Sequence, residues 1–148
     1  NMITYLSYSK YYGFDTDPNY IDYAKNKYPN CNFFCEKFTN SSLKKITKVD
    51  IVILFGILHH ISDKEILKLI DYLRLSLKKN SKIVILDPVY IENQNKFAKF
   101  LIDHDRGDYV RTAKEYINLF KKKKIFYTYK IYHQKIIPYT YIVSILKN

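Results

Sequence analysis

Apolar residues gather in short runs along this chain, and the runs alternate with stretches of helical spacing. Two runs, residues 50–56 (DIVILFG) and 82–87 (KIVILD), are almost continuously apolar, which is typical of parallel strands buried on both faces. Further strands are predicted at residues 11–15, 32–36, 125–133 and 139–146. Only a short connection containing Pro138 separates the last two, so they are expected to form an antiparallel hairpin.

Helices are predicted between the strands from capping signals. Asp17 is a typical N-cap and Pro18 a typical first residue, which predicts a helix over residues 18–27. A short helical piece is also expected over residues 2–9, and Asn80-Ser81 is expected to turn the chain into the strand that follows.

Two capping boxes, Ser62 with Glu65 and Thr112 with Glu115, open two more helices. Helical spacing predicts that each buries one apolar face. These faces are Ile66, Ile70, Leu73 and Leu77 in the first and Ala113, Tyr116, Ile117 and Phe120 in the second. The segment that carries Phe97, Phe100 and Leu101 is interpreted as polar, without an element of its own.

Strands that alternate with helices predict an α/β fold with a parallel sheet and helices on both faces. No linker or repeat divides the chain, so we expect a single domain over residues 1–148. Ligands of such sheets lie outside the carboxyl ends of the strands. This rule selects Asp15, Glu36, Gly56 and Asp87 as positions for chemistry.

Composition narrows the class of protein only slightly. The chain is 47% hydrophobic with a net charge of +11, and its lysines are scattered except at residues 121–124. A positive field favours anionic partners, so nucleic-acid binding stays open without being favoured. Cys31 and Cys35 are expected to be reduced packing residues of a cytoplasmic protein. No apolar run reaches the ~18 residues that a membrane span needs.

The strand ends and their motifs resemble those of class I S-adenosylmethionine-dependent methyltransferases over nearly the whole length. YGFDTDPNYI resembles the family's second strand, DIVILFGILHHISD its fourth strand and the loop after it, and KKNSKIVILDPV its fifth. The closing hairpin fits the sixth and seventh strands. The resemblance implies a Rossmann-like three-layer sandwich with a mostly parallel sheet and a C-terminal antiparallel hairpin. It also implies S-adenosyl-L-methionine as cofactor and methyl transfer to an oxygen or nitrogen of a small molecule.

By this resemblance Asp15 accepts hydrogen bonds from the ribose hydroxyls of the cofactor, and Thr16 lies beside the adenine. Two carboxylate oxygens suit two vicinal hydroxyls. Alternatively, the negative charge of Asp15, like that of Asp17, only favours the start of the helix that follows.

The other cofactor-binding candidates follow the third and fourth strands. Lys37 occupies the position at which the family often has an acid that contacts the adenine, and Glu36 precedes that position by one residue. Phe38 either stacks on the adenine ring or is only a packing residue of the protein. Phe55 and Gly56 close the fourth strand, where glycine lets the main chain approach the methionine part.

Three residues are candidates for catalysis. His59 and His60 follow the fourth strand, and each is either a general base, a positioning residue or purely structural. Methyl transfer depends mainly on aligning the nucleophile with the methyl group, so a positioning role is preferred for the pair. Asp87 at the end of the fifth strand is a second candidate base.

The densest polar cluster, residues 103–112, is expected to cover the substrate. Its pattern D-R-G-x-Y-V-R-T, with I-P-Y-T at residues 137–140, resembles small-molecule methyltransferases of biosynthetic and glycan clusters. The substrate-binding candidates are Asp105, Arg106, Tyr109 and Arg111. Both arginines suit a carboxylate or phosphate, and the alternative is an Asp/Arg network that fixes the loop.

The family's first strand and its glycine-rich loop have no counterpart here, since the three glycines (Gly13, Gly56 and Gly107) form no such motif. We therefore expect an N-terminally truncated domain, as a fragment, as a degenerate member or as a chain completed by a partner. The competing functions are an RNA-binding or RNA-methylating protein, a nicotinamide-dependent oxidoreductase and a non-catalytic methyltransferase-like subunit. The acceptor molecule and the oligomeric state are not specified by the sequence.

Overall fold

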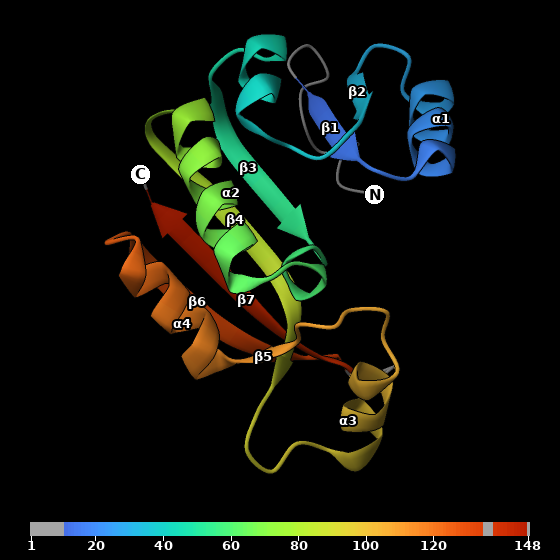
Figure 1. Cartoon of the computed structure of the whole chain (residues 1–148). Coiled ribbons are helices and arrows are strands. Elements are labelled where there is room, and N and C mark those ends of the chain that lie inside the picture. The colour runs from blue at the N-terminus through green and yellow to red at the C-terminus, as the bar shows by residue number, and fades with distance from the viewer. Residues whose placement is uncertain (1–10, 135–137, 148) are drawn as a thin grey trace. The chain divides into compact units, whose positions relative to one another are not determined.

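A computed structural model describes residues 11–134 and 138–147 of the chain. The chain divides into two compact units, Asn1–Thr47 and Lys48–Asn148, each with its own sheet (Figure 1). The helix expected over residues 2–9 lies outside the described residues. The assignment of one domain over residues 1–148 stays a prediction.

The first unit is a small parallel βαβ arrangement. Its elements are β1 (Tyr12–Asp15), α1 (Pro18–Lys27), β2 (Asn32–Cys35) and the 3₁₀ helix η3 (Asn40–Lys45). β1 and β2 pair in parallel, so that Asp15 lies opposite Cys35 and both strands end at the same edge. The helix begins as predicted: the Asp17 carboxylate accepts from the Asn19 amide at 2.8 Å, and Pro18 is the first helical residue.

The second unit is built on a mixed sheet. Its elements are β3 (Val49–Phe55), the 3₁₀ helix η4 (Leu58–His60), α2 (Asp63–Ser76), β4 (Leu77–Tyr90), α3 (Lys96–Asp103), β5 (Arg111–Thr112), α4 (Ala113–Lys122), β6 (Phe126–His133) and β7 (Thr140–Lys147). The strand order is β3-β4-β7-β6, with β5 paired to β4. β4 runs parallel to β3 and β5, and the β6–β7 hairpin is antiparallel. The predicted α/β class with a C-terminal antiparallel hairpin is confirmed.

β1 and β3 are among the strands that have a single paired neighbour within the described part of the chain. β1 pairs only with β2, and β3 pairs only with β4.

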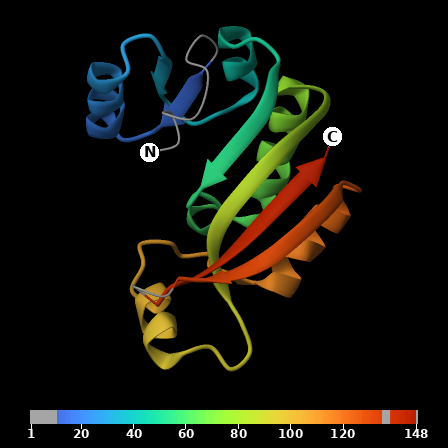
Figure 2. The same ribbon diagram turned by 180° about the vertical axis from the view of Figure 1, so that it is seen from behind.

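The core of the second unit lies between its sheet and two amphipathic helices. α2 and α4 cover the same face of the sheet, and the view from behind shows its other face (Figure 2). Both capping boxes form as predicted. Ile66, Ile70 and Leu73 of the face expected for α2 are buried, whereas Leu77 is buried as the first residue of β4. Helix α4 buries Leu119 with Tyr116 and Phe120 and leaves Ala113 and Ile117 half-buried. On the other face Phe55 is exposed and Ile145 half-buried.

Two local features differ from the sequence prediction. The segment interpreted as polar contains α3, whose N-cap Asn95 accepts from the amides of Phe97 and Ala98. The helix buries Ala98 and Ile102, whereas Phe97 and Phe100 are exposed. Asn80 adopts a left-handed conformation (φ 63°), but β4 continues through it with a shift in its register to β3.

Replacement of Ile70 by Ala should lower the free energy of unfolding by about 2–5 kcal/mol, since it leaves a cavity in the core. Ile70 is fully buried on α2, whereas Leu75 of the same helix is 55% exposed. Leu75→Ala is the matched control and should change the value by less than about 0.5 kcal/mol. Urea denaturation measures both, and equal effects would contradict this packing.

Candidate functional site

A buried carboxylate organises the loop after β3. Asp87 of β4 is fully buried and accepts hydrogen bonds from three consecutive main-chain amides, those of Ile57, Leu58 and His59, at 3.0, 2.8 and 3.0 Å. The Tyr116 hydroxyl of α4 donates to the same group at 3.1 Å. A carboxylate with this many donors is compensated for its loss of water. It fixes the chain at η4 against β4.

The same carboxylate orients the His59 ring. His59 is 4% exposed, and its Nδ1 lies 2.8 Å from Asp87 Oδ1. Because an ionised carboxylate can only accept, Nδ1 carries the proton of the neutral ring and Nε2 keeps its lone pair. Nε2 lies 3.8 Å from Asp105 Oδ2, on the opposite side of the ring from Asp87.

The loop after α3 lies directly against His59. The Tyr109 amide donates to the His59 carbonyl at 2.9 Å, and Gly107 packs against the imidazole ring. A Cβ at Gly107 would lie 2.0 Å from His59 Cδ2, so no side chain fits there. Glycine at position 107 therefore permits the loop to lie this close to the His59 ring.

Arg111 ties the two loops together. Its guanidinium is 5% exposed and donates to Asp63 Oδ1 and to the carbonyls of Leu58, Ile61 and Tyr109 at 2.7–2.8 Å. This geometry favours the loop-fixing alternative for Arg111 over contact with a substrate.

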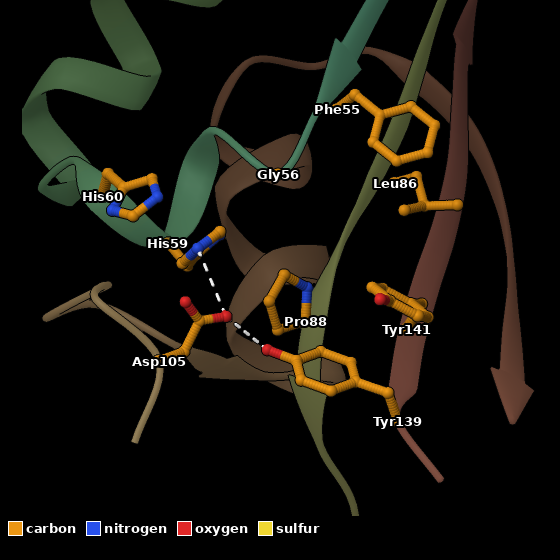
Figure 3. Close-up of a pocket in the computed structure, with 9 residues that line it drawn as sticks. All are labelled: Phe55, Gly56, His59, His60, Leu86, Pro88, Asp105, Tyr139 and Tyr141. Carbon is orange, nitrogen blue, oxygen red and sulfur yellow. Dashed lines mark hydrogen bonds and ion pairs between the residues drawn. The ribbon is translucent and has the colours of Figure 1, made fainter. Parts of the chain in front are cut away.

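A cavity of about 360 Å³ opens at the carboxyl end of β3, beside Gly56 and the His59 ring (Figure 3). Its lining residues are Phe55, Gly56, His59, His60, Leu86, Pro88, Asp105, Tyr139 and Tyr141. Gly56 adopts φ 62°, a conformation that glycine takes without strain. The exposed His60 ring packs on His59 with centroids 4.0 Å apart. The cavity thus occupies the place where α/β sheets hold ligands.

Asp105 is the carboxylate of the cavity. In Figure 3 it lies between His59 and Tyr139, whose hydroxyl donates to its Oδ2, while Oδ1 accepts from the Arg106 amide. Burial raises the pKa of Asp105, but these hydrogen bonds and the nearby His59 and His60 outweigh burial and hold the pKa below its usual value. Burial and the bond to Asp105 raise the pKa of Tyr139. Asp105 is therefore an anion and Tyr139 a neutral donor at pH 7.

Four cofactor-binding candidates lie in the first unit, at the carboxyl ends of β1 and β2. Asp15 is exposed and accepts from the Asp17 amide at 2.9 Å through Oδ1, so it also supports the helix start. Thr16 and Lys37 are exposed. Phe38 packs edge-on against Phe14, with ring centroids 5.0 Å apart.

Glu36, the last residue of the strand predicted over residues 32–36, belongs to an internal network. Ser42 donates to it at 3.0 Å and Lys45 forms an ion pair with it, and these interactions lower its pKa.

The structure brings together five of the predicted site residues around the cavity: Phe55, Gly56, His59, His60 and Asp105. Asp87 lies directly behind His59, while Arg106 and the 44% exposed Tyr109 lie on the same loop outside the lining. Sequence reasoning missed Tyr139 and Tyr141 as lining residues. Tyr139 belongs to the I-P-Y-T motif and directly precedes β7, and Tyr141 lies two residues further on, so alternation along extended chain places both on one side.

Two classes of site find no support in the described part of the chain. No group of three or more histidines, cysteines or acids there could hold a metal ion. None of its helices is long and apolar enough to cross a membrane.

A mixed α/β sheet with a ligand cavity at the carboxyl end of a parallel strand defines a Rossmann-like protein. The chain belongs to the family described as "Methyltransferase domain", whose model matches residues 2–80, just over half of its length. No curated protein matches the chain.

Solved structures confirm the fold. Human N-acetylserotonin methyltransferase in complex with SAM superposes with a TM-score of 0.66 and 17% identity over 94% of this chain, which spans 40% of the human enzyme. A SAM-dependent methyltransferase from Archaeoglobus fulgidus gives 0.70 and 13%, over 93% of this chain and 75% of that one. N-methyltransferase NodS from Bradyrhizobium japonicum WM9 gives 0.67 and 10%, over 94% and 73%. Identities this low support the fold and not a particular substrate.

Replacement of Gly107 by Ala should displace the His59 ring, because the new methyl group would lie 2.0 Å from His59 Cδ2 and 2.7 Å from the His59 carbonyl oxygen. We expect a loss of about 1–3 kcal/mol of stability and a changed NMR signal of the His59 ring. Asp108→Ala, an exposed position on the same loop, is the control and should change neither. An unchanged ring signal in Gly107→Ala would contradict the contact.

Proposed function

We propose that the chain is a methyltransferase domain that binds S-adenosyl-L-methionine and transfers its methyl group to an oxygen or nitrogen of a small molecule. The observation that carries this proposal is the His59 ring, held by Asp87 with Nε2 directed to the side of Asp105 in a cavity beside Gly56. Family membership and neighbours named as small-molecule and N-methyltransferases support it.

The cofactor residues are proposed one by one from the family resemblance. Asp15, with a second oxygen beyond the one bound to Asp17, suits the ribose hydroxyls, and Thr16, Lys37 and Phe38 suit the adenine side. Phe55 and Gly56 suit the methionine side, where Gly56 exposes main chain for close approach. When bound, this cofactor supplies an electrophilic methyl group on a sulfonium.

The protein's own part in such a reaction is to position the acceptor and take its proton. His59 Nε2 is the proposed proton acceptor, because Nδ1 is already bonded to Asp87. Asp87 has the role of positioning residue in this scheme, since its oxygens are occupied by main-chain amides, His59 and Tyr116. His60, exposed beside it, is proposed to shape the cavity wall.

The loop over residues 103–112 is proposed to cover the acceptor. Asp105 faces the cavity and contacts the acceptor, while Arg106 and Tyr109 stand at the rim of the loop. Arg111 fixes the loop through its buried hydrogen bonds. A cytoplasmic location belongs to the same proposal.

Calorimetric titration of the folded 148-residue chain with S-adenosylhomocysteine tests the cofactor assignment. We expect saturable binding that Asp15→Asn weakens about tenfold or more, since a charged hydrogen-bond acceptor contributes about 1.5–3 kcal/mol. Asp22→Asn removes an exposed acid from α1 and should leave the affinity unchanged. A folded chain that does not bind the ligand would contradict the proposal.

A further inference from the structure

The cavity has a charge opposite to that of the chain. The net charge is +11, with 25 lysines and arginines against 14 acids. Yet the described residues that line the cavity include no lysine or arginine and one carboxylate, Asp105. A cavity that excludes the commonest charge of its own chain is unsuited to an anionic guest.

Aromatic rings form much of the remaining lining. Phe55 is 56% exposed at the end of β3. Tyr139 and Tyr141 lie beside one another, with ring centroids 4.8 Å apart and an interplanar angle of 33°. Aromatic faces attract organic cations through the ring quadrupole, and a nearby carboxylate adds to the attraction.

The carboxylate keeps capacity for a guest. Asp105 is 31% exposed and accepts from the Tyr139 hydroxyl and the Arg106 amide. A carboxylate offers about four lone-pair sites, so further donors can bind to it. Because Asp105 lines the cavity, its remaining lone pairs are accessible to a guest there.

We propose that the cavity binds an organic ammonium group, so that the acceptor of the proposed methyl transfer is an amine held by Asp105 and the rings of Phe55, Tyr139 and Tyr141. This rests on the proposed function as far as methyl transfer is concerned, but the binding of the ammonium group does not.

His59 completes the site chemically. An ammonium nitrogen has no free lone pair, so it must lose a proton before it can act as a nucleophile. His59 Nε2 lies 3.8 Å from Asp105 Oδ2 and is the basic atom beside the bound cation. In this step one N–H bond of the ammonium group breaks, its electron pair stays on nitrogen, and the proton joins Nε2. The products are a neutral amine and an imidazolium between two carboxylates, Asp87 and Asp105.

A pair of nearly isosteric probes tests the binding directly. Benzylamine is a cation at pH 7 and benzyl alcohol is neutral, and both are titrated into the full chain without S-adenosylmethionine. NMR signals of the Tyr139 and Tyr141 rings report occupancy of the cavity. We expect benzylamine to bind about tenfold more tightly than benzyl alcohol, from the ring and carboxylate attraction together.

Variants assign the preference to the cavity. Asp105→Asn should reduce the preference for benzylamine, because only the attraction of the rings remains, and should leave the affinity for benzyl alcohol unchanged. Asp105→Glu should retain the preference. Asp108→Asn removes an exposed acid from the same loop and should have no effect. Equal affinities of the two probes for the unmodified chain would overturn the proposal even if Asp105→Asn failed to fold. So would a preference that Asp105→Asn leaves intact.

The failure of this inference and that of the proposed function are distinguishable. Binding of S-adenosylhomocysteine together with equal affinities for the two probes would support the proposed function and contradict the amine acceptor. A preference for benzylamine without binding of S-adenosylhomocysteine would support the cation site and contradict the cofactor assignment.

Discussion

The structure of the candidate site depends on one buried carboxylate. Asp87 is fully buried on β4, an interior strand of the sheet, where an uncompensated charge would be costly. Three main-chain amides, an imidazole and a phenol converge on it, so its burial requires that the loop after β3, β4 and α4 be in place together. Burial also raises the pKa of the Tyr116 phenol, and the Asp87 charge adds to this effect. Tyr116 therefore stays a donor to Asp87 at neutral pH.

The geometry of the cavity follows from this anchor. With His59 held by Asp87, its carbonyl receives the Tyr109 amide and its ring packs on Gly107. Arg111 then connects the same loop to the carbonyls of Leu58 and Ile61. Asp105 reaches the cavity because the loop that carries it is fixed on both sides. Asp87 thus positions the base His59 directly and the anion Asp105 indirectly.

Local patterns in the sequence were sufficient for most elements. Asp17 with Pro18 and the two capping boxes placed three helix starts correctly, because caps are interactions within four residues. The two continuous apolar runs became the parallel pair β3–β4, although β4 extends past both ends of its predicted run. Helix α3 was missed although Phe97, Phe100 and Leu101 have helical spacing; its buried side chains are Ala98 and Ile102.

The site itself could be predicted only in part. Strand ends selected Asp87 and Gly56, and the histidine pair was visible in the sequence. The roles were not, because the partners of Asp87 are main-chain amides about 30 residues away, which have no sequence signature. Arg111 was expected at a substrate or in a loop-fixing network, and only its carbonyl partners distinguish these. Tyr141 joins the cavity through the register of β7, which the sequence does not specify.

Asp87 holds His59 as the Nδ1–H tautomer, with Nε2 directed toward the cavity. A long-range ¹H–¹⁵N correlation spectrum of the histidine rings at a pH where His59 is neutral measures this directly. We expect a protonated Nδ1 and an unprotonated Nε2 for His59. A spectrum in which Nε2 carries the proton and Nδ1 does not would contradict it.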